Sequence, residues 1–139
     1  MSIESILDYK TIAVVGISDD PTRPSHFVAS FLKEHGYNIV PVNPKYTEWK
    51  GEKCYPDLSS IPVKVDIVDI FRRSEAIPPI VDEAIAIKAK VVWMQQGIIN
   101  EDAAEKARRA GIEVVMDKCI KTEYITYRRK GVEKFPSAR

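Results

Sequence analysis

The chain has 139 residues, of which 45% are hydrophobic and 29% are charged; this composition predicts one folded domain and excludes a disordered chain. A formal charge of +1 provides no field that would hold a polyanion, so we expect no nucleic acid as a partner. The two cysteines form no CxxC or Cys/His cluster, and no apolar run reaches the length of a membrane span. We therefore expect no disulfide framework, no metal site, no membrane contact and a cytoplasmic location.

Five short apolar runs, rich in Val and Ile, recur at wide spacing along the chain. Their apolar residues are nearly continuous rather than alternating, which is typical of parallel strands covered on both faces. The expected strands are residues 11–16, 38–42, 65–71, 90–94 and 112–116.

Three segments between these strands have the apolar spacing of helices. The first follows Pro24 and ends at Gly36, the second starts at Ser74 or near Pro78, and the third follows Asn100 and ends at Gly111. We expect residues 2–8 to form a short docking helix. Residues 43–64 contain several prolines, which favours a surface loop with little regular structure.

This alternation predicts a three-layer, Rossmann-type α/β fold with a five-stranded parallel sheet. We expect the strand order 3-2-1-4-5, with the flavodoxin-like order 2-1-3-4-5 left open. Residues 1–127 would form the domain and residues 128–139 a basic tail. In either order, ligands bind beyond the carboxyl ends of the strands, where the order reverses.

The residues that follow the strands favour an anion at this edge of the sheet. Gly16 permits close backbone approach, and Ser18, Arg23 and Ser25 can donate to phosphate oxygens beside free N–H groups of the first helix. The neighbouring carboxylates, at positions 19 and 20, would have to point away.

The second and third strands favour a nucleotide with an additional ribose phosphate. A nicotinamide-binding domain usually shows G-x-G-x-x-G and an acid after the second strand, whereas Lys45 stands where that acid would be. Lys45 suits the phosphate of NADP or the 3′-phosphate of coenzyme A, and Phe71, Arg72 and Arg73 offer an apolar face and charge for adenosine. A small NADP-dependent oxidoreductase is the alternative, and an interaction module that uses the basic tail is a third.

Several sequence blocks in the same order resemble a known family. They are Val15-Gly16-Ile17-Ser18 with Pro21, Arg23, Ser25, His26 and Val28, then Val42-Asn43-Pro44-Lys45, Gly51 with Cys54-Tyr55, Val68 to Arg73, Trp93 with Gln96-Gly97-Ile98, and Met116-Asp117-Lys118-Cys119. Over about residues 6–124 the chain resembles the small single-domain CoA-binding proteins, which are similar to the N-terminal domain of the α subunit of succinyl-CoA synthetase.

The resemblance implies a role for each matching position. The pyrophosphate would contact Gly16, Ile17, Ser18, Arg23 and Ser25, and the ribose phosphate would contact Pro44 and Lys45. The adenosine would lie beside Phe71, Arg72 and Arg73, and the pantetheine arm beside Gln96, Gly97 and Ile98. Asn43 is a further expected cofactor-binding residue. The synthetase's phosphohistidine belongs to another domain, so the resemblance implies binding of CoA or an acyl-CoA and not ligase activity.

We assign no catalytic residue, since the chain has no Ser/His/Asp set. Cys119 has two interpretations: a thiol that forms a mixed disulfide with CoA, or a small buried side chain. A homodimer and an unidentified partner enzyme both stay open as further partners.

Overall fold

The computed structural model describes residues 2–134, in which the five expected strands and three expected helices all form. The helices are α1 (Ile3–Ile6), α2 (Pro24–Glu34), α3 (Ile77–Ala86), α4 (Glu101–Arg109) and α5 (Ile120–Lys134). The strands are β1 (Thr11–Val15), β2 (Asn38–Val42), β3 (Glu48–Trp49), β4 (Glu52–Lys53), β5 (Ile67–Ile70), β6 (Val91–Met94) and β7 (Glu113–Val115). A 3-10 turn, Ser74–Ala76, directly precedes α3. Helical structure therefore begins at Ser74, the earlier of the two starting points that the sequence allowed.

Five strands form one parallel sheet in the order β2-β1-β5-β6-β7, which confirms the Rossmann-type α/β fold with a five-stranded parallel sheet. The expected order 3-2-1-4-5 is wrong, and the order found is the alternative, 2-1-3-4-5. β5 pairs with β1, with Val14 opposite Asp69, rather than with β2.

Pro41 explains why β2 lies at the edge of the sheet. Its carbonyl accepts a hydrogen bond from the Tyr55 amide at 3.0 Å, so its backbone polar groups face away from β1. A proline has no N–H to donate, so a strand paired along that side would lose a ladder hydrogen bond. The order 3-2-1-4-5 would have put β2 in such an interior position.

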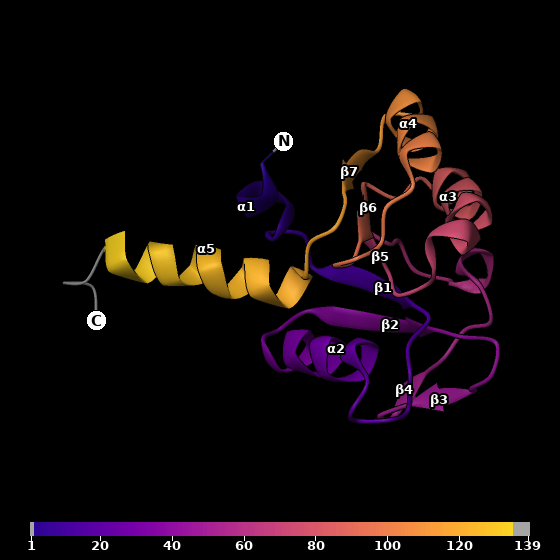
Figure 1. Cartoon of the computed structure of the whole chain (residues 1–139). Coiled ribbons are helices and arrows are strands. Elements are labelled where there is room, and N and C mark those ends of the chain that lie inside the picture. The colour runs from indigo at the N-terminus through magenta and orange to yellow at the C-terminus, as the bar shows by residue number, and fades with distance from the viewer. Residues whose placement is uncertain (1, 135–139) are drawn as a thin grey trace.

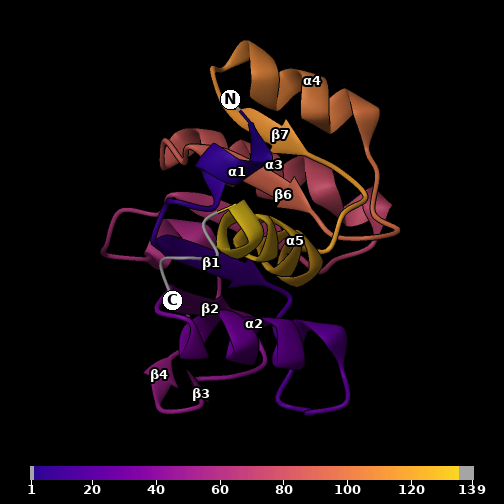
Figure 2. The ribbon, with the colours of Figure 1, turned by 90° about the vertical axis from the view of Figure 1, so that its left-hand side faces the viewer.

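The helices cover the two faces of the sheet in separate groups. Figure 1 shows α3 and α4 together on one side of the molecule and α2 on the other, and Figure 2 shows α5 in front of β1, between α1 and α2. Side chains alternate accordingly: in β1, Ala13 and Val15 join the core under α3 and α4, whereas Ile12 and Val14 join the core under α1, α2 and α5.

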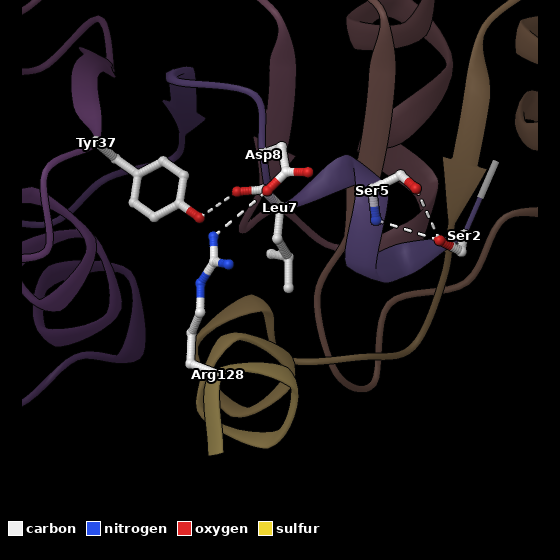
Figure 3. Close-up of polar contacts among 6 residues, drawn as sticks. All are labelled: Ser2, Ser5, Leu7, Asp8, Tyr37 and Arg128. Atoms are coloured by element: carbon white, nitrogen blue, oxygen red, sulfur yellow. Dashed lines mark hydrogen bonds and ion pairs between the residues drawn. The ribbon is translucent and has the colours of Figure 1, made fainter. Parts of the chain in front are cut away.

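Polar contacts join the segment after α1 to Tyr37, directly before β2, and to the middle of α5 (Figure 3). The Tyr37 hydroxyl donates to the Leu7 carbonyl, and the Arg128 guanidinium lies 3.6 Å from the Asp8 carboxylate. Because α5 spans Ile120–Lys134, the boundary expected between residues 127 and 128 falls inside a helix, and of the expected tail only residues 135–139 lie outside the described residues.

No helix in the described part of the chain has both the length and the apolar composition needed to span a membrane.

The segment between β2 and β5 contains more regular structure than the sequence predicted. β3 and β4 form a short antiparallel hairpin whose two-residue turn, Lys50-Gly51, has positive φ at both positions. Positive φ at both central residues is the signature of a type I′ turn. The hairpin buries Trp49, which is 2% exposed, against the loop that follows β1.

Candidate functional site

A cavity of about 1000 Å³ lies at the carboxyl ends of the parallel strands, beside the point where β1 meets β5. It brings together all but one of the residues that the sequence predicted for the site: Gly16, Ile17, Ser18, Arg23, Ser25, Asn43, Lys45, Phe71, Arg72, Arg73, Gln96, Gly97, Ile98 and Cys119. Pro44 is exposed and lies outside the lining. The lining also includes residues that sequence reasoning did not assign: Pro24, Phe27, Val28, Tyr46, Ser74, Glu75 and Gln95.

Gly16 allows the first and third loops of the site to touch. Its φ of +88° is in the left-handed region that favours glycine. A Cβ at this position would lie 2.6 Å from the Phe71 carbonyl oxygen and 3.1 Å from Nε of Arg72. The close approach therefore requires glycine, and it puts the loop after β1 directly beside the loop after β5.

Two buried side chains from the β2–β4 region hold the loop after β1. Nδ2 of Asn43 donates to the Ile17 carbonyl at 2.7 Å, and its Oδ1 accepts from the Lys45 amide at 2.9 Å. Nε1 of Trp49 donates to the Ser18 carbonyl at 3.0 Å. The Asn43 side chain thus joins the loop after β1 to the loop after β2 by hydrogen bonds within the protein. Sequence reasoning missed Trp49, because only the hairpin turn brings this residue to the site.

The loop after β1 and the start of α2 present unoccupied hydrogen-bond donors. Among residues 2–128, whose side chains the structure describes, the backbone amides of Ile17, Ser18 and Ser25 have no acceptor, and Arg23 forms no ion pair. The Ser18 hydroxyl accepts from the Asp20 amide at 3.0 Å, which leaves its own proton available. These donors point to an anion rather than a cation.

The two aspartates of this loop accept hydrogen bonds from other residues and do not line the cavity. The Asp19 carboxylate accepts from the Tyr46 hydroxyl at 3.1 Å, and neither Asp19 nor Asp20 is among the lining residues. Asp20 accepts from the amide and the hydroxyl of Thr22, and these hydrogen bonds lower the pKa of its carboxyl group. The two carboxylates therefore lie outside the space that an anion would fill.

Three cations from two other loops complete the charged wall. In the described part of the chain, Lys45 and Arg72 form no ion pair, whereas Arg73 lies 3.4 Å from the Glu75 carboxylate. Phe71 is half-buried next to them. The wall thus combines positive charge with an aromatic surface, a combination suited to a phosphorylated nucleoside.

The loop after β6 supplies another part of the lining. The Gly97 amide donates to Oδ1 of Asp117 at 2.7 Å, and the Ile98 amide donates to the Gln95 carbonyl at 2.9 Å. Gln95 is 4% exposed, and its side-chain oxygen accepts from the Ile120 amide at 3.1 Å. Gln95 therefore joins this loop to the first residue of α5.

The two cysteines differ in position. Cys119 is a half-buried free thiol in the cavity lining, directly before α5, and its carbonyl accepts from the Glu123 amide at 3.0 Å. Cys54 is 4% exposed and outside the lining; its thiol donates to the Asn43 carbonyl at 3.6 Å, and burial raises its pKa. Over residues 2–128, whose side chains the structure describes, no group of three or more His, Cys, Asp and Glu side chains is placed to hold a metal ion.

The fold and the cavity together define a Rossmann-type α/β domain with an anion-favouring cavity at the switch point of its sheet. The chain belongs to the CoA-binding domain family, whose model matches residues 10–125, and the resemblance seen in the sequence is confirmed.

Three relatives show what else the chain is similar to. The uncharacterized protein YneT of Bacillus subtilis is 44% identical over 115 residues, which are 83% of this chain and 85% of that protein. A solved hypothetical protein from Pyrococcus horikoshii has a TM-score of 0.87 and 40% identity, covering 91% of this chain and 92% of that one. The α subunit of acetate–CoA ligase (ADP-forming) I from Pyrococcus furiosus is 32% identical over 83% of this chain, but the match spans only 28% of that subunit.

Proposed function

We propose that this chain binds coenzyme A or an acyl-CoA in the cavity at the carboxyl ends of its parallel strands. The observation that carries the proposal is the convergence of unpaired cations and free backbone donors on one cavity, in a chain of the CoA-binding domain family. The finer assignments below follow from the chemistry of the lining.

The pyrophosphate fits the loop after β1. The free amides of Ile17, Ser18 and Ser25 and the guanidinium of Arg23 surround the N-terminus of α2. Backbone donors and the positive end of a helix stabilise a phosphate without needing a lysine at each oxygen.

The phosphorylated adenosine fits the side formed by Lys45 and the loop after β5. Lys45 is exposed and forms no ion pair in the described part of the chain, so its ammonium group is available for the ribose 3′-phosphate. Phe71 and Arg72 offer flat surfaces for adenine.

The pantetheine arm fits along residues 96–98 and would bring its sulfur toward Cys119, which lines the same cavity. We assign binding and not ligation: the match spans 28% of the Pyrococcus furiosus ligase subunit, so we do not carry over the ligase activity of that protein.

Calorimetric titration of the folded protein with CoA, dephospho-CoA and NADP⁺ tests this function. We expect CoA to bind more tightly than dephospho-CoA by about tenfold, since one charge-assisted contact to a phosphate contributes about 1.5 kcal/mol. Lys45→Ala should remove most of this difference, and Lys64→Ala, an exposed lysine outside the cavity, should leave it unchanged.

Absence of binding by CoA would refute the function. CoA binding with equal affinity for dephospho-CoA would refute only the role of Lys45, and tighter binding of NADP⁺ than of CoA would favour the oxidoreductase alternative.

A further inference from the structure

Gln95 is a buried side chain whose amide group has one end bound within the protein. It directly follows β6, lines the cavity and is 4% exposed. Its Oε1 accepts from the Ile120 amide at 3.1 Å. An N–H group needs an acceptor, so this contact determines which end of the Gln95 amide is oxygen and which is nitrogen.

The amide nitrogen of Gln95 has no acceptor among residues 2–128, whose side chains the structure describes. In that part of the chain, the side-chain N and O atoms that are fully enclosed without a partner are the two carboxyl oxygens of Asp69, so Nε2 of Gln95 is not sealed off. Because Gln95 is almost completely buried and lines the cavity, the surface that Nε2 reaches is the cavity. Gln95 therefore offers a buried, unpaired N–H donor to a ligand.

Gln95 lies in the uncharged part of the lining. In the order of the sheet, the cations of the cavity follow β2, β1 and β5. The lining residues that follow β6 and β7 carry no carboxylate, ammonium or guanidinium group; they are Gln95, Gln96, Gly97, Ile98 and Cys119. CoA has its phosphates at one end and an uncharged arm that ends in sulfur at the other. With the phosphates on the cations, the sulfur end lies beside β6 and β7.

The surroundings of the Gln95 donor suit an acyl group. Ile120, to which Gln95 is hydrogen-bonded, directly follows Cys119 of the lining. The Phe27 ring also lines the cavity, is 43% exposed, and lies 5.6 Å from the ammonium group of Lys121 in the same turn of α5. Free CoA ends here in a thiol, which is a weak acceptor, whereas an acyl-CoA adds a carbonyl oxygen and an apolar chain.

We propose that the cavity selects an acyl-CoA thioester over free CoA, and that Nε2 of Gln95 makes the selection by donating a hydrogen bond to the thioester carbonyl. Gln95 is then a residue that determines specificity by contact with the ligand, and no bond is formed or broken. The inference rests on the proposed function, since it takes the arm of CoA to lie along the loop after β6.

Calorimetric titration with acetyl-CoA, S-ethyl-CoA and CoA tests the selection. S-ethyl-CoA has a methylene group in place of the acetyl carbonyl, so it differs from acetyl-CoA in one acceptor. We expect acetyl-CoA to bind about fivefold more tightly than S-ethyl-CoA, which corresponds to one neutral hydrogen bond. Acetyl-CoA should also bind more tightly than CoA.

Gln95→Met removes the donor and keeps a side chain of similar length. This variant should bind acetyl-CoA and S-ethyl-CoA with equal affinity, because neither ligand then gains a hydrogen bond from residue 95. Asn38→Leu is the matched control: it also replaces an amide by an apolar side chain, at the exposed first residue of β2 and outside the cavity. It should keep the fivefold difference.

NMR of the wild type gives a second measurement, which applies even if Gln95→Met does not fold. The chain has two glutamines, Gln95 and the exposed Gln96, so ¹⁵N-glutamine labelling yields two side-chain amide signals. An amide proton that gains a hydrogen bond moves to lower field. We expect this shift for Gln95 with acetyl-CoA and not with S-ethyl-CoA.

Three results would overturn the selection while leaving CoA binding intact: equal affinities for acetyl-CoA and S-ethyl-CoA in the wild type, a difference that survives in Gln95→Met, or a Gln95 amide signal that responds equally to both ligands. Absence of binding by all three ligands would instead refute the proposed function, and this inference with it.

Discussion

At the scale of single residues, Gly16 sets the distance between two loops of the site. The loop after β1 reaches the loop after β5 only because this position has no side chain. Gly36 has a similar φ, +93° against +88°, but a Cβ there would have nothing within 4 Å. A comparison of the two glycines therefore distinguishes the cost of a left-handed backbone from the cost of a steric clash.

Gly16→Ala should destabilise the protein more than Gly36→Ala. Both variants strain a left-handed backbone, by about 1 kcal/mol, and Gly16→Ala adds a clash with the Phe71 carbonyl that should bring its loss to about 3 kcal/mol. Urea unfolding of the two variants and the wild type gives the free energies of unfolding. Equal losses would show that contact with the Phe71 loop is not what requires glycine.

At the scale of elements, the cavity walls are loops, and side chains from other elements fix their shape. Trp49, from the β3–β4 hairpin, holds the loop after β1, and Gln95 joins the loop after β6 to α5. A loop whose amides stay free for a ligand forms few hydrogen bonds within itself. Its carbonyl groups therefore need donors from other elements. Trp49 of the hairpin thus supports a cavity loop although Trp49 itself does not line the cavity.

Trp49→Phe should weaken CoA binding severalfold, because the Ser18 carbonyl loses its donor and the loop no longer holds one position. The unpaired carbonyl should also lower the free energy of unfolding by about 1–3 kcal/mol. Tyr37→Phe is the control, since it removes a comparable buried hydrogen bond, to the Leu7 carbonyl, away from the cavity. Calorimetry should find CoA affinity lowered only in Trp49→Phe, and an equal loss in both would assign the effect to stability alone.

At the scale of the whole molecule, the buried Asp69 couples stability to pH. Its pKa is raised in the folded protein, so between the ordinary value, near 3.8, and the raised value the folded state holds a proton that the unfolded state has lost. The resulting stabilisation is fully present below the ordinary pKa and is lost as pH rises through the raised one.

The free energy of unfolding of the wild type should therefore fall with rising pH over this range, and Asp69→Asn should flatten the dependence, since an amide does not titrate. Urea unfolding at a series of pH values measures both slopes. A wild-type slope that survives in Asp69→Asn would mean that other groups cause it.

Most of the fold could be predicted because buried parallel strands are continuously apolar and helices end at glycines. α5 could not, since the face it packs inward carries Ile120, Tyr124 and Tyr127, and the tyrosines are only half-buried, so its apolar pattern is weak. The strand order was mispredicted because periodicity does not determine neighbours, although Pro41 already marked β2 as an edge strand.

The amino-acid sequence by itself determined the class of fold and the family, and nearly all the residues that it assigned to the site line the cavity, since strand ends and their turn residues are local features. Only the tertiary structure decided that Asn43 and Trp49 donate hydrogen bonds to the loop after β1, and that Asp69 is buried without a hydrogen-bond partner on the side of the sheet where Cys119 packs. These facts depend on contacts between segments distant in the chain, and burial and pairing arise from the packing of the whole molecule.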